Sequence, residues 1–315
     1  MDYLILIIGL TLLLNGANVL VDSSVAIARK AHLSNFIIGL TIVGMGTSAP
    51  EFFISLSSAI NGHGDIAMGN AVGSNICNAF LILGVTGVIL PFSIQREQTR
   101  RDIPFTIAAS ILVTILALCG THHGLSRIDG AILTASFIAY MTYVVIKGRG
   151  DDNQPDEQQP NAYQRFNVAI LLLIALAALA ALLGGGTLFL NSATAIARAW
   201  GISESVISIT IVALGTSLPE LITCILAARR GNAQLALGNV LGSNIFNILF
   251  VLGVPALVHP FNTESMAAAD YIVMILSAVA CYMVVFTFGK KKFDRIEGVL
   301  FLLAYIAYDI YLFTR

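Results

Sequence analysis

The sequence carries little charge for its length. Only 11% of its 315 residues are charged and 57% are hydrophobic, whereas about a quarter of an ordinary soluble domain is charged. A soluble fold needs charged side chains between the apolar atoms of its surface, and so few cannot cover a protein of this size. The mean hydropathy of +0.85 therefore indicates a chain that is solvated mainly by lipid.

Other classes of protein are excluded by what is missing. The formal net charge of -1 gives no basic surface for nucleic acid. The residues Met1-Asp2-Tyr3 lack the positive charge that opens a cleaved signal peptide, so we expect none. No obligatory protein partner is evident. The cysteines have no CxxC spacing, and we expect four small buried hydrophobic residues without a disulfide: Cys77, Cys119, Cys224 and Cys281.

Long apolar segments are abundant. Crossing a hydrocarbon layer of about 30 Å takes about 20 helical residues. The sequence predicts an all-α polytopic membrane protein with ten transmembrane helices, near residues 3–27, 36–60, 66–91, 103–120, 128–147, 166–196, 205–228, 233–258, 268–289 and 296–313. The polar, acidic segment 148–164 cannot bury a core. We expect it to link a first half, 1–147, to a second half, 165–315.

The basic residues predict an orientation. Ten spans place alternate loops on opposite sides of the membrane, and cytoplasmic loops carry an excess of Lys and Arg. The loops after the odd-numbered spans carry fourteen of the seventeen basic residues. We therefore expect a plasma or inner membrane protein with both termini outside the cytoplasm and the linker inside. Arg229 and Arg230 would anchor this topology, and Asp22, near a span end, would reach the interface.

The two halves contain a sequence repeat. A shift of 169 residues aligns 41–84 with 210–253 without a gap, and 20 of the 44 paired positions are identical. A repeat at a fixed offset indicates duplicated structural units. Because a unit of five spans is odd-numbered, the second unit must enter the membrane from the opposite face. The sequence thus predicts two inverted five-helix repeats, an architecture common among secondary transporters.

The identities are concentrated in polar motifs. Gly-Thr-Ser-x-Pro-Glu occurs at 46–51 and 215–220, and Gly-Asn-x-x-Gly-Ser-Asn-Ile-x-Asn at 69–78 and 238–247. A carboxylate at the bilayer midplane costs about 2.5–3.5 kcal/mol on the lowest scales. Each half nevertheless places one, Glu51 or Glu220, near the middle of its second span. We expect both carboxylates to face a shared polar site instead of lipid.

These motifs supply oxygen ligands. The proline of each first motif removes a helical hydrogen bond and frees backbone carbonyls in the preceding turn. Thr47 and Glu51 are four residues apart, as are Ser74 and Asn78, so each pair shares a helix face. Hydroxyl, amide, carboxylate and carbonyl oxygens suit hard cations such as sodium and calcium. No clustered His or Cys spacing suggests zinc or copper.

Two carboxylates supply a charge that one divalent cation neutralises and that monovalent ions can share after it leaves. The sequence therefore predicts a secondary active antiporter that exchanges calcium for sodium, with a calcium/proton antiporter as the alternative. A membrane-embedded enzyme is disfavoured because no nucleophile–base pair accompanies the carboxylates. A passive channel is disfavoured because such pores usually form between several subunits.

The paired motifs resemble the alpha repeats of the sodium/calcium exchanger branch of the calcium/cation antiporters, and the ten-span layout fits its compact prokaryotic members. The resemblance implies that Glu51 and Glu220 are the central calcium ligands, helped by the backbone carbonyls of Thr47 and Thr216. It implies that the first and sixth helices slide across the core to alternate access. It also implies flanking sodium sites lined by Ser48, Ser74, Ser217 and Ser243, by the carbonyls of Gly44 and Ala213, and, on the first-repeat side, by Asn78.

One position departs from the family pattern. Many of these exchangers carry an aspartate where this chain has Asn247, so the site would have two carboxylates instead of three. The counter-ion is therefore left open between sodium, protons and a potassium-dependent sodium exchange, because protonating a buried glutamate is an alternative to binding sodium. No cofactor is expected; calcium and sodium ions, together with the lipid bilayer, are the expected partners.

Overall fold

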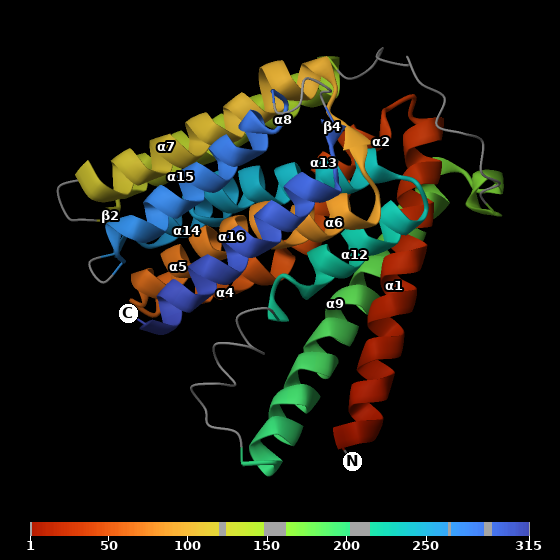
Figure 1. The fold of residues 1–315 in the computed structure, drawn as a ribbon, viewed down its shortest axis with the longest axis horizontal. Helices are drawn as coiled ribbons and strands as arrows, with labels where there is room; N and C mark the ends of the chain where they lie inside the picture. Colours follow the sequence, from red (N-terminus) through yellow and green to blue (C-terminus); the bar gives the residue numbers. More distant parts are fainter. Residues whose placement is uncertain are drawn as a thin grey trace.

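The computed structural model describes residues 2–119, 124–147, 162–201, 215–263, 266–286 and 292–314, and most of them are helical. The helical elements are α1 (Asp2–Lys30), α2 (Asn35–Ile38), η1 (Gly39–Val43), α3 (Gly44–Thr47), α4 (Ala49–Ile60), α5 (Gly64–Ile76), η2 (Cys77–Ile82), α6 (Leu83–Ile89), η3 (Gln98–Asp102), α7 (Ile103–Cys119), α8 (Arg127–Lys147), η4 (Ala162–Arg165), α9 (Val168–Ala199), α12 (Leu218–Arg229), α13 (Ala233–Phe246), η6 (Asn247–Val251), α14 (Gly253–Val258), α15 (Ala268–Met283) and α16 (Arg295–Thr314). Figure 1 shows them as one bundle from which α1 and α9 extend together.

The long helices match the apolar segments. Within the described residues, six continuous helical segments are long and apolar enough to cross a membrane, and one bent pair makes a seventh. Two further expected spans correspond to α15 and α16. The expected span 205–228 begins outside the described residues and is seen from residue 215 onward. The described part of the chain is therefore mostly helical and of a multi-pass membrane type, while the count of ten spans stays a prediction.

The two segments that carry the asparagine-rich motif lie in the middle of the bundle. In the most apolar stretch of residues 64–89, 72% of the residues are buried in the protein, and in residues 233–258 the share is 83%, against 28% for α9. Each segment widens into a π-helical turn, η2 or η6, as the motif ends. Such turns are frequent at functional sites. The motif therefore faces protein and not lipid.

Helices α1 and α9 pack backbone to backbone along their length (Figure 1). A Cβ atom on Gly16 would lie 2.6 Å from the amide nitrogen of Leu182, and a Cβ atom on Gly185 would lie 2.5 Å from that of Leu13. Small residues at membrane helix contacts allow this close approach. The two helices consequently form a tightly joined pair.

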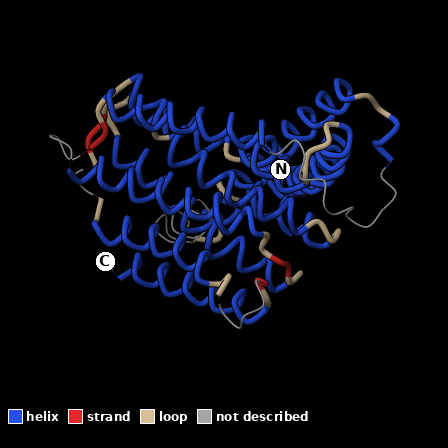
Figure 2. Tube along the Cα trace, turned by 90° about the horizontal axis from the view of Figure 1, so that it is seen from above, coloured by secondary structure: helices blue, strands red, loops and turns tan. Residues whose placement is uncertain are grey.

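Short strands connect the two halves of the chain. The four strands are β1 (Phe92–Ser93), β2 (Gly124–Leu125), β3 (Phe261–Asn262) and β4 (Lys292–Phe293). β1 pairs with β4 and β2 with β3, both antiparallel, and the two pairs lie at opposite margins of the bundle (Figure 2). Across the first pair the rings of Phe92 and Phe293 stack with centroids 5.4 Å apart. Each pair takes one strand from each half.

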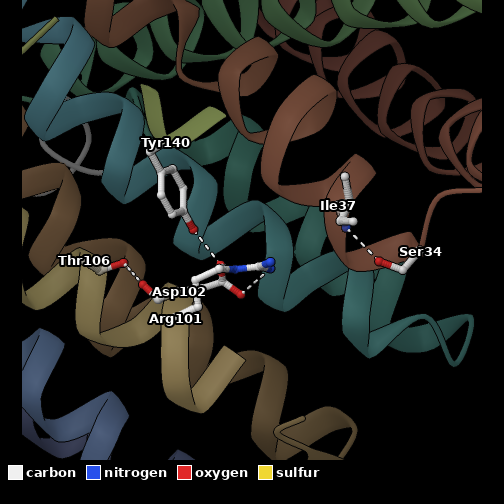
Figure 3. Close-up of polar contacts among 6 residues, drawn as sticks. All are labelled: Ser34, Ile37, Arg101, Asp102, Thr106 and Tyr140. Carbon is white, nitrogen blue, oxygen red and sulfur yellow. Dashed lines mark hydrogen bonds and ion pairs between the residues drawn. The ribbon is translucent and has the colours of Figure 1, made fainter. Parts of the chain in front are cut away.

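A buried carboxylate away from the motifs is fully paired. Asp102 receives hydrogen bonds from Arg101 Nε at 2.6 Å and from the Tyr140 hydroxyl at 2.6 Å (Figure 3). A hydrogen-bonded and charge-paired carboxylate is stable without a ligand. Tyr308 and Asp270 repeat the tyrosine–aspartate bond at 3.1 Å. At the start of α2, Ser34 caps the helix by accepting from the amide of Ile37 (Figure 3).

One expectation about a single residue needs correction, and one contact was not predicted. Cys119 is exposed at the end of α7, whereas the other three cysteines are buried; all four are free. The interfacial position of Asp22 and the anchoring role of Arg230 stay predictions, and the two side chains bind each other. The Arg230 guanidinium binds the Asp22 carboxylate and donates to the Asn18 side-chain oxygen at 2.7 Å. This contact ties α1 to the end of α12 and depends on tertiary packing that no local pattern records.

Two neighbouring glycines of α9 test the packing against α1. We expect Gly185→Ala to lower the stability by about 1–3 kcal/mol, the usual cost of overpacking, because its methyl group would meet the α1 backbone. The matched control is Gly184→Ala, where a Cβ atom meets nothing within 4 Å. Alanine there favours the helix by about 0.5–1 kcal/mol. Thermal unfolding of the detergent-purified variants measures both, and equal midpoints would contradict this packing.

Candidate ion-binding site

The two glutamates follow matched breaks in their helices. α3 and α4 meet at Ser48, whose backbone has φ -85° and ψ 12°, and α12 begins after Ser217, with φ -87° and ψ 5°. The helix axes on the two sides of the first break differ by 46°. A proline in the first turn after each break is tolerated because that turn needs no amide donor. Glu51 and Glu220 therefore lie in the first turn of a helix, near its positive end.

Both glutamates are buried and incompletely paired. Each is 1% exposed. Among the described residues, neither carboxyl oxygen of Glu51 has a hydrogen-bond partner, and Glu220 has one, the Ser48 hydroxyl, which donates to Oε1 at 2.8 Å. The two carboxyls also interact electrostatically with each other. A buried charge without partners costs several kcal/mol, so this pair requires a positive ion or a proton.

The hydroxyl groups of one break lie beside the glutamate of the other half. Thr47 joins Ser48 next to Glu220. Thr216, from the second break, lies beside Glu51 together with Ser74. The structure thus brings both glutamates, both threonines and these two serines into one region between the halves.

The remaining expected site residues differ in burial and in hydrogen bonding. The Ser243 hydroxyl donates to the backbone carbonyl of Gly44 at 3.1 Å. Asn78 and Asn247 are buried, and within the described part of the chain the side-chain oxygen of each lacks a partner, as does the amide nitrogen of Asn247. Ser217 is buried beside the Cys77 thiol. Ala213 lies outside the described residues.

Equivalent asparagines of the two halves bind each other. Asn75 Nδ2 donates to the Asn244 carbonyl at 3.2 Å, and Asn244 Nδ2 donates to the Asn75 carbonyl at 3.5 Å. Their side-chain oxygens have no partner in the described segments. The reciprocal bonds cross-link α5 and α13 one residue away from Ser74 and Ser243.

The donor set determines what the site can hold. Its atoms are carboxylate, amide, hydroxyl and carbonyl oxygens, which hard cations prefer. Within the described segments no three His, Cys, Asp or Glu side chains gather as a metal-binding group. Buried polar atoms without partners are rare in proteins and call for an explanation such as a bound ion or water. The unpartnered oxygens of Glu51, Glu220 and the motif asparagines suit small cations that shed their water.

Further polar residues contact the first break, and no role for them was predicted from the sequence. Asn70 Nδ2 donates to Ser55 Oγ at 2.9 Å and to the Glu51 carbonyl at 3.0 Å. Asn239 Nδ2 lies 3.1 Å from the Cys224 sulfur, and Asn239 Oδ1 accepts from the Thr47 hydroxyl at 3.2 Å. The identity of both asparagines between the halves was the available signal.

Comparison with known proteins matches the chain to one family and its relatives. The family model described as "Sodium/calcium exchanger protein" matches residues 1–146 and 170–314. The putative antiporter CaxA of Alkalimonas amylolytica is 37% identical over 98% of this chain and 97% of its own length. The inner membrane protein YrbG of Escherichia coli K12 is 34% identical over 87% of this chain and 86% of its own.

A solved structure has the same fold. The sodium–calcium exchanger NCX_Mj, in crystals soaked without sodium or calcium, superimposes with a TM-score of 0.84. It is 33% identical, and the match covers 99% of this chain and 98% of that one.

Proposed function

Because the chain belongs to the sodium/calcium exchanger family, we propose that it carries calcium in exchange for sodium through the buried site between its halves. It is a multi-pass membrane transporter and not an enzyme. The observation that carries the proposal is the pair of glutamates at 1% exposure with three unpaired carboxyl oxygens among the described residues. One calcium ion balances both charges, and sodium ions at flanking positions share the same two carboxylates after calcium leaves.

In this proposal Glu51 and Glu220 are the central calcium ligands, and the backbone carbonyls of Thr47 and Thr216 complete their site. The burial of both carboxyls and their mutual electrostatic interaction support this assignment. Sodium would occupy flanking positions lined by Ser48, Ser74, Ser217, Ser243, Asn78 and Asn247 and by the carbonyls of Gly44 and Ala213.

The proposal includes two inverted five-helix repeats, ten spans in all, joined by a cytoplasmic linker at 148–164. Several offsets support the repeat. Helices α4 and α12 have twelve residues each and start 169 residues apart, as do β1 and β3. If β1 corresponds to β3 and β2 to β4, then exchanging the halves turns each strand pair into the other. Both termini would lie outside the cytoplasm, in a plasma or inner membrane.

Ion gradients imposed one at a time test the function. In proteoliposomes of the purified chain, we expect uptake of radioactive calcium to follow an outward sodium gradient and to saturate, as counterflow through a carrier does. Uptake driven by a proton gradient alone would favour the calcium/proton alternative. A need for potassium beside sodium would favour the potassium-dependent exchange that the missing third carboxylate leaves open. Absence of calcium uptake under every gradient would refute the proposal.

Neutralising either glutamate tests the ligand assignment. Glu51→Gln and Glu220→Gln each remove one of two charges from the site, so we expect sodium-driven calcium uptake to fall below about 1% of wild type, a loss of more than about 2.7 kcal/mol. Both variants should still insert and purify as folded protein. The exposed carboxylate Glu97 provides the control Glu97→Gln, which should transport normally. Unimpaired uptake by both glutamine variants would disprove the assignment.

Restoring a third carboxylate tests the role of position 247. Asn247 is fully buried, and within the described chain neither of its amide atoms has a partner. If it faces the ions, Asn247→Asp adds a charge beside them and should tighten calcium binding about tenfold, roughly 1.4 kcal/mol, or change the number of sodium ions per calcium. Asn78→Asp is the matched variant of the first half. Unchanged affinity and stoichiometry in Asn247→Asp would place this residue outside the site.

A further inference from the structure

Helix α1 is fastened to the end of α12 by an arginine that follows that helix. The Arg230 guanidinium binds the Asp22 carboxylate, and it donates to the backbone carbonyl of Asn18 at 3.2 Å and to the Asn18 side-chain oxygen at 2.7 Å. The planar fork of a guanidinium can hold several acceptors at once. We call Arg230, Asn18 and Asp22 the Arg230 clamp. It joins α1 to the helix that carries Glu220.

The end of α4 has the same backbone turn as the end of α12 but a different side chain. Gly62 and Gly231, 169 residues apart, have φ angles of +78° and +77°, so both helices end in the same left-handed turn. The residue before Gly231 is Arg230, and the residue before Gly62 is Asn61. Asn61 Nδ2 donates to the Ser57 carbonyl of its own helix at 2.8 Å. This side chain therefore closes its own helix and has no charge to offer α9.

The acceptors of the clamp are also missing from α9. The shift of 169 residues, which aligns an Ala-Ile-Ala-Arg segment near the end of each helix, pairs Asn18 with Thr187 and Asp22 with Asn191. The Thr187 hydroxyl donates to a carbonyl within α9 at 3.0 Å, and Asn191 is exposed and uncharged. The equivalent positions of α4 and α9 consequently cannot form the ion pair that Arg230 makes. The two halves share their ion-site motifs and differ in this contact.

Helix α1 is also packed more tightly beside the clamp than α9 is at the equivalent place. Residues 20–28 of α1 are all buried except Asp22. Among the equivalent residues 189–197 of α9, the buried ones are Ser192, Thr194, Ile196 and Ala197. The bundle is therefore closed around α1 beside the clamp and packed less closely around the matching part of α9.

Exchange through a site between the halves requires that ions reach it from each side of the membrane in turn. Contacts that close one side must then break and form again. In an inverted repeat the halves trade roles between the two access states, so a contact that only one half can make gives the states unequal free energies. The clamp is able to break, because the side chains of Arg230 and Asp22 are 30% and 35% exposed and both charges can be hydrated when it opens.

We propose that the Arg230 clamp is a latch that holds α1 against α12 and favours the access state in which the ion site is closed on the side where α12 ends. The clamp residues act through helix packing and bind no transported ion. By the predicted orientation this side is the cytoplasmic one, so the ion-free protein rests open to the outside. The inference rests on the proposed sodium/calcium exchange and adds a preferred direction of access to it.

Half-saturating calcium concentrations measured at each membrane face test the latch. Sodium-loaded right-side-out and everted vesicles present opposite faces to the added calcium. A membrane-impermeant maleimide identifies the clamp face, the face on which Arg230 lies, by labelling Arg229→Cys in a variant without the four native cysteines. At the clamp face, Arg230→Gln should lower the half-saturating concentration about fivefold, the weight of a partly exposed charged contact, because more of the ion-free protein is open there. At the other face the value should stay the same or rise.

The second variant of the clamp is Asp22→Asn, which should shift the same concentration in the same direction. Because the two residues act as one pair, the double variant should shift it no further than Arg230→Gln alone. The matched control is Arg229→Gln, which removes an exposed arginine from the same turn and should equal wild type at both faces.

Three results would overturn the inference: unchanged values at both faces, a higher value at the clamp face, or shifts of the single variants that add in the double variant. A clamp that only stabilises the fold predicts less folded protein, with wild-type values at both faces for the molecules that remain. If Arg230→Gln does not insert stably, the shift of Asp22→Asn decides. Wild-type vesicles without sodium-dependent calcium flux would instead refute the proposed function.

Discussion

The centre of this bundle depends on two carboxyl groups that are buried away from water with too few hydrogen-bond donors around them. Asp102 shows how the same chain treats a buried acid that needs no ligand: Arg101 and Tyr140 satisfy it directly. Glu51 has no such partner among the described residues, and Glu220 has one. The difference lies in the neighbours and not in the depth of burial, since all three are at most 1% exposed. Incomplete pairing thus separates the two glutamates, which we propose hold a mobile ion, from an acid whose partners the fold itself supplies.

The other features at the centre of the bundle place oxygen atoms around those two glutamates. The breaks at Ser48 and Ser217 start a new helix just before each glutamate, which brings hydroxyls and a positive helix end to the carboxyls. The two motif segments 64–89 and 233–258 must then be surrounded by other helices, because their amides cannot face lipid. Helices α1 and α9 instead leave most of their apolar surface unburied by the protein, and their contact with each other depends on glycine.

Much of this was predictable from sequence because the signals are local or repeated. The lengths of the apolar segments predicted the helices. The residues that are identical at a fixed offset identified the paired glutamates and the polar motifs. Contacts between the halves were not predictable. Nothing in the residues near Ser48 indicates that its hydroxyl reaches Glu220, or that Arg230 reaches Asp22 across more than 200 positions. Such pairings depend on how helices cross, and the exposure of Cys119 likewise depends on what packs against the end of α7.

The strand pairs that join the two halves affect when the chain can fold during its synthesis. β1 has its partner in β4 and β2 has its partner in β3, so each closing contact joins residues that leave the ribosome far apart in time. A nascent first half has neither strand partner, and it has no second glutamate motif beside Glu51, until the second half is made. Assembly of this protein is therefore a late event of its synthesis, and a chain that ends at residue 147 lacks the partner for both strands that it contains.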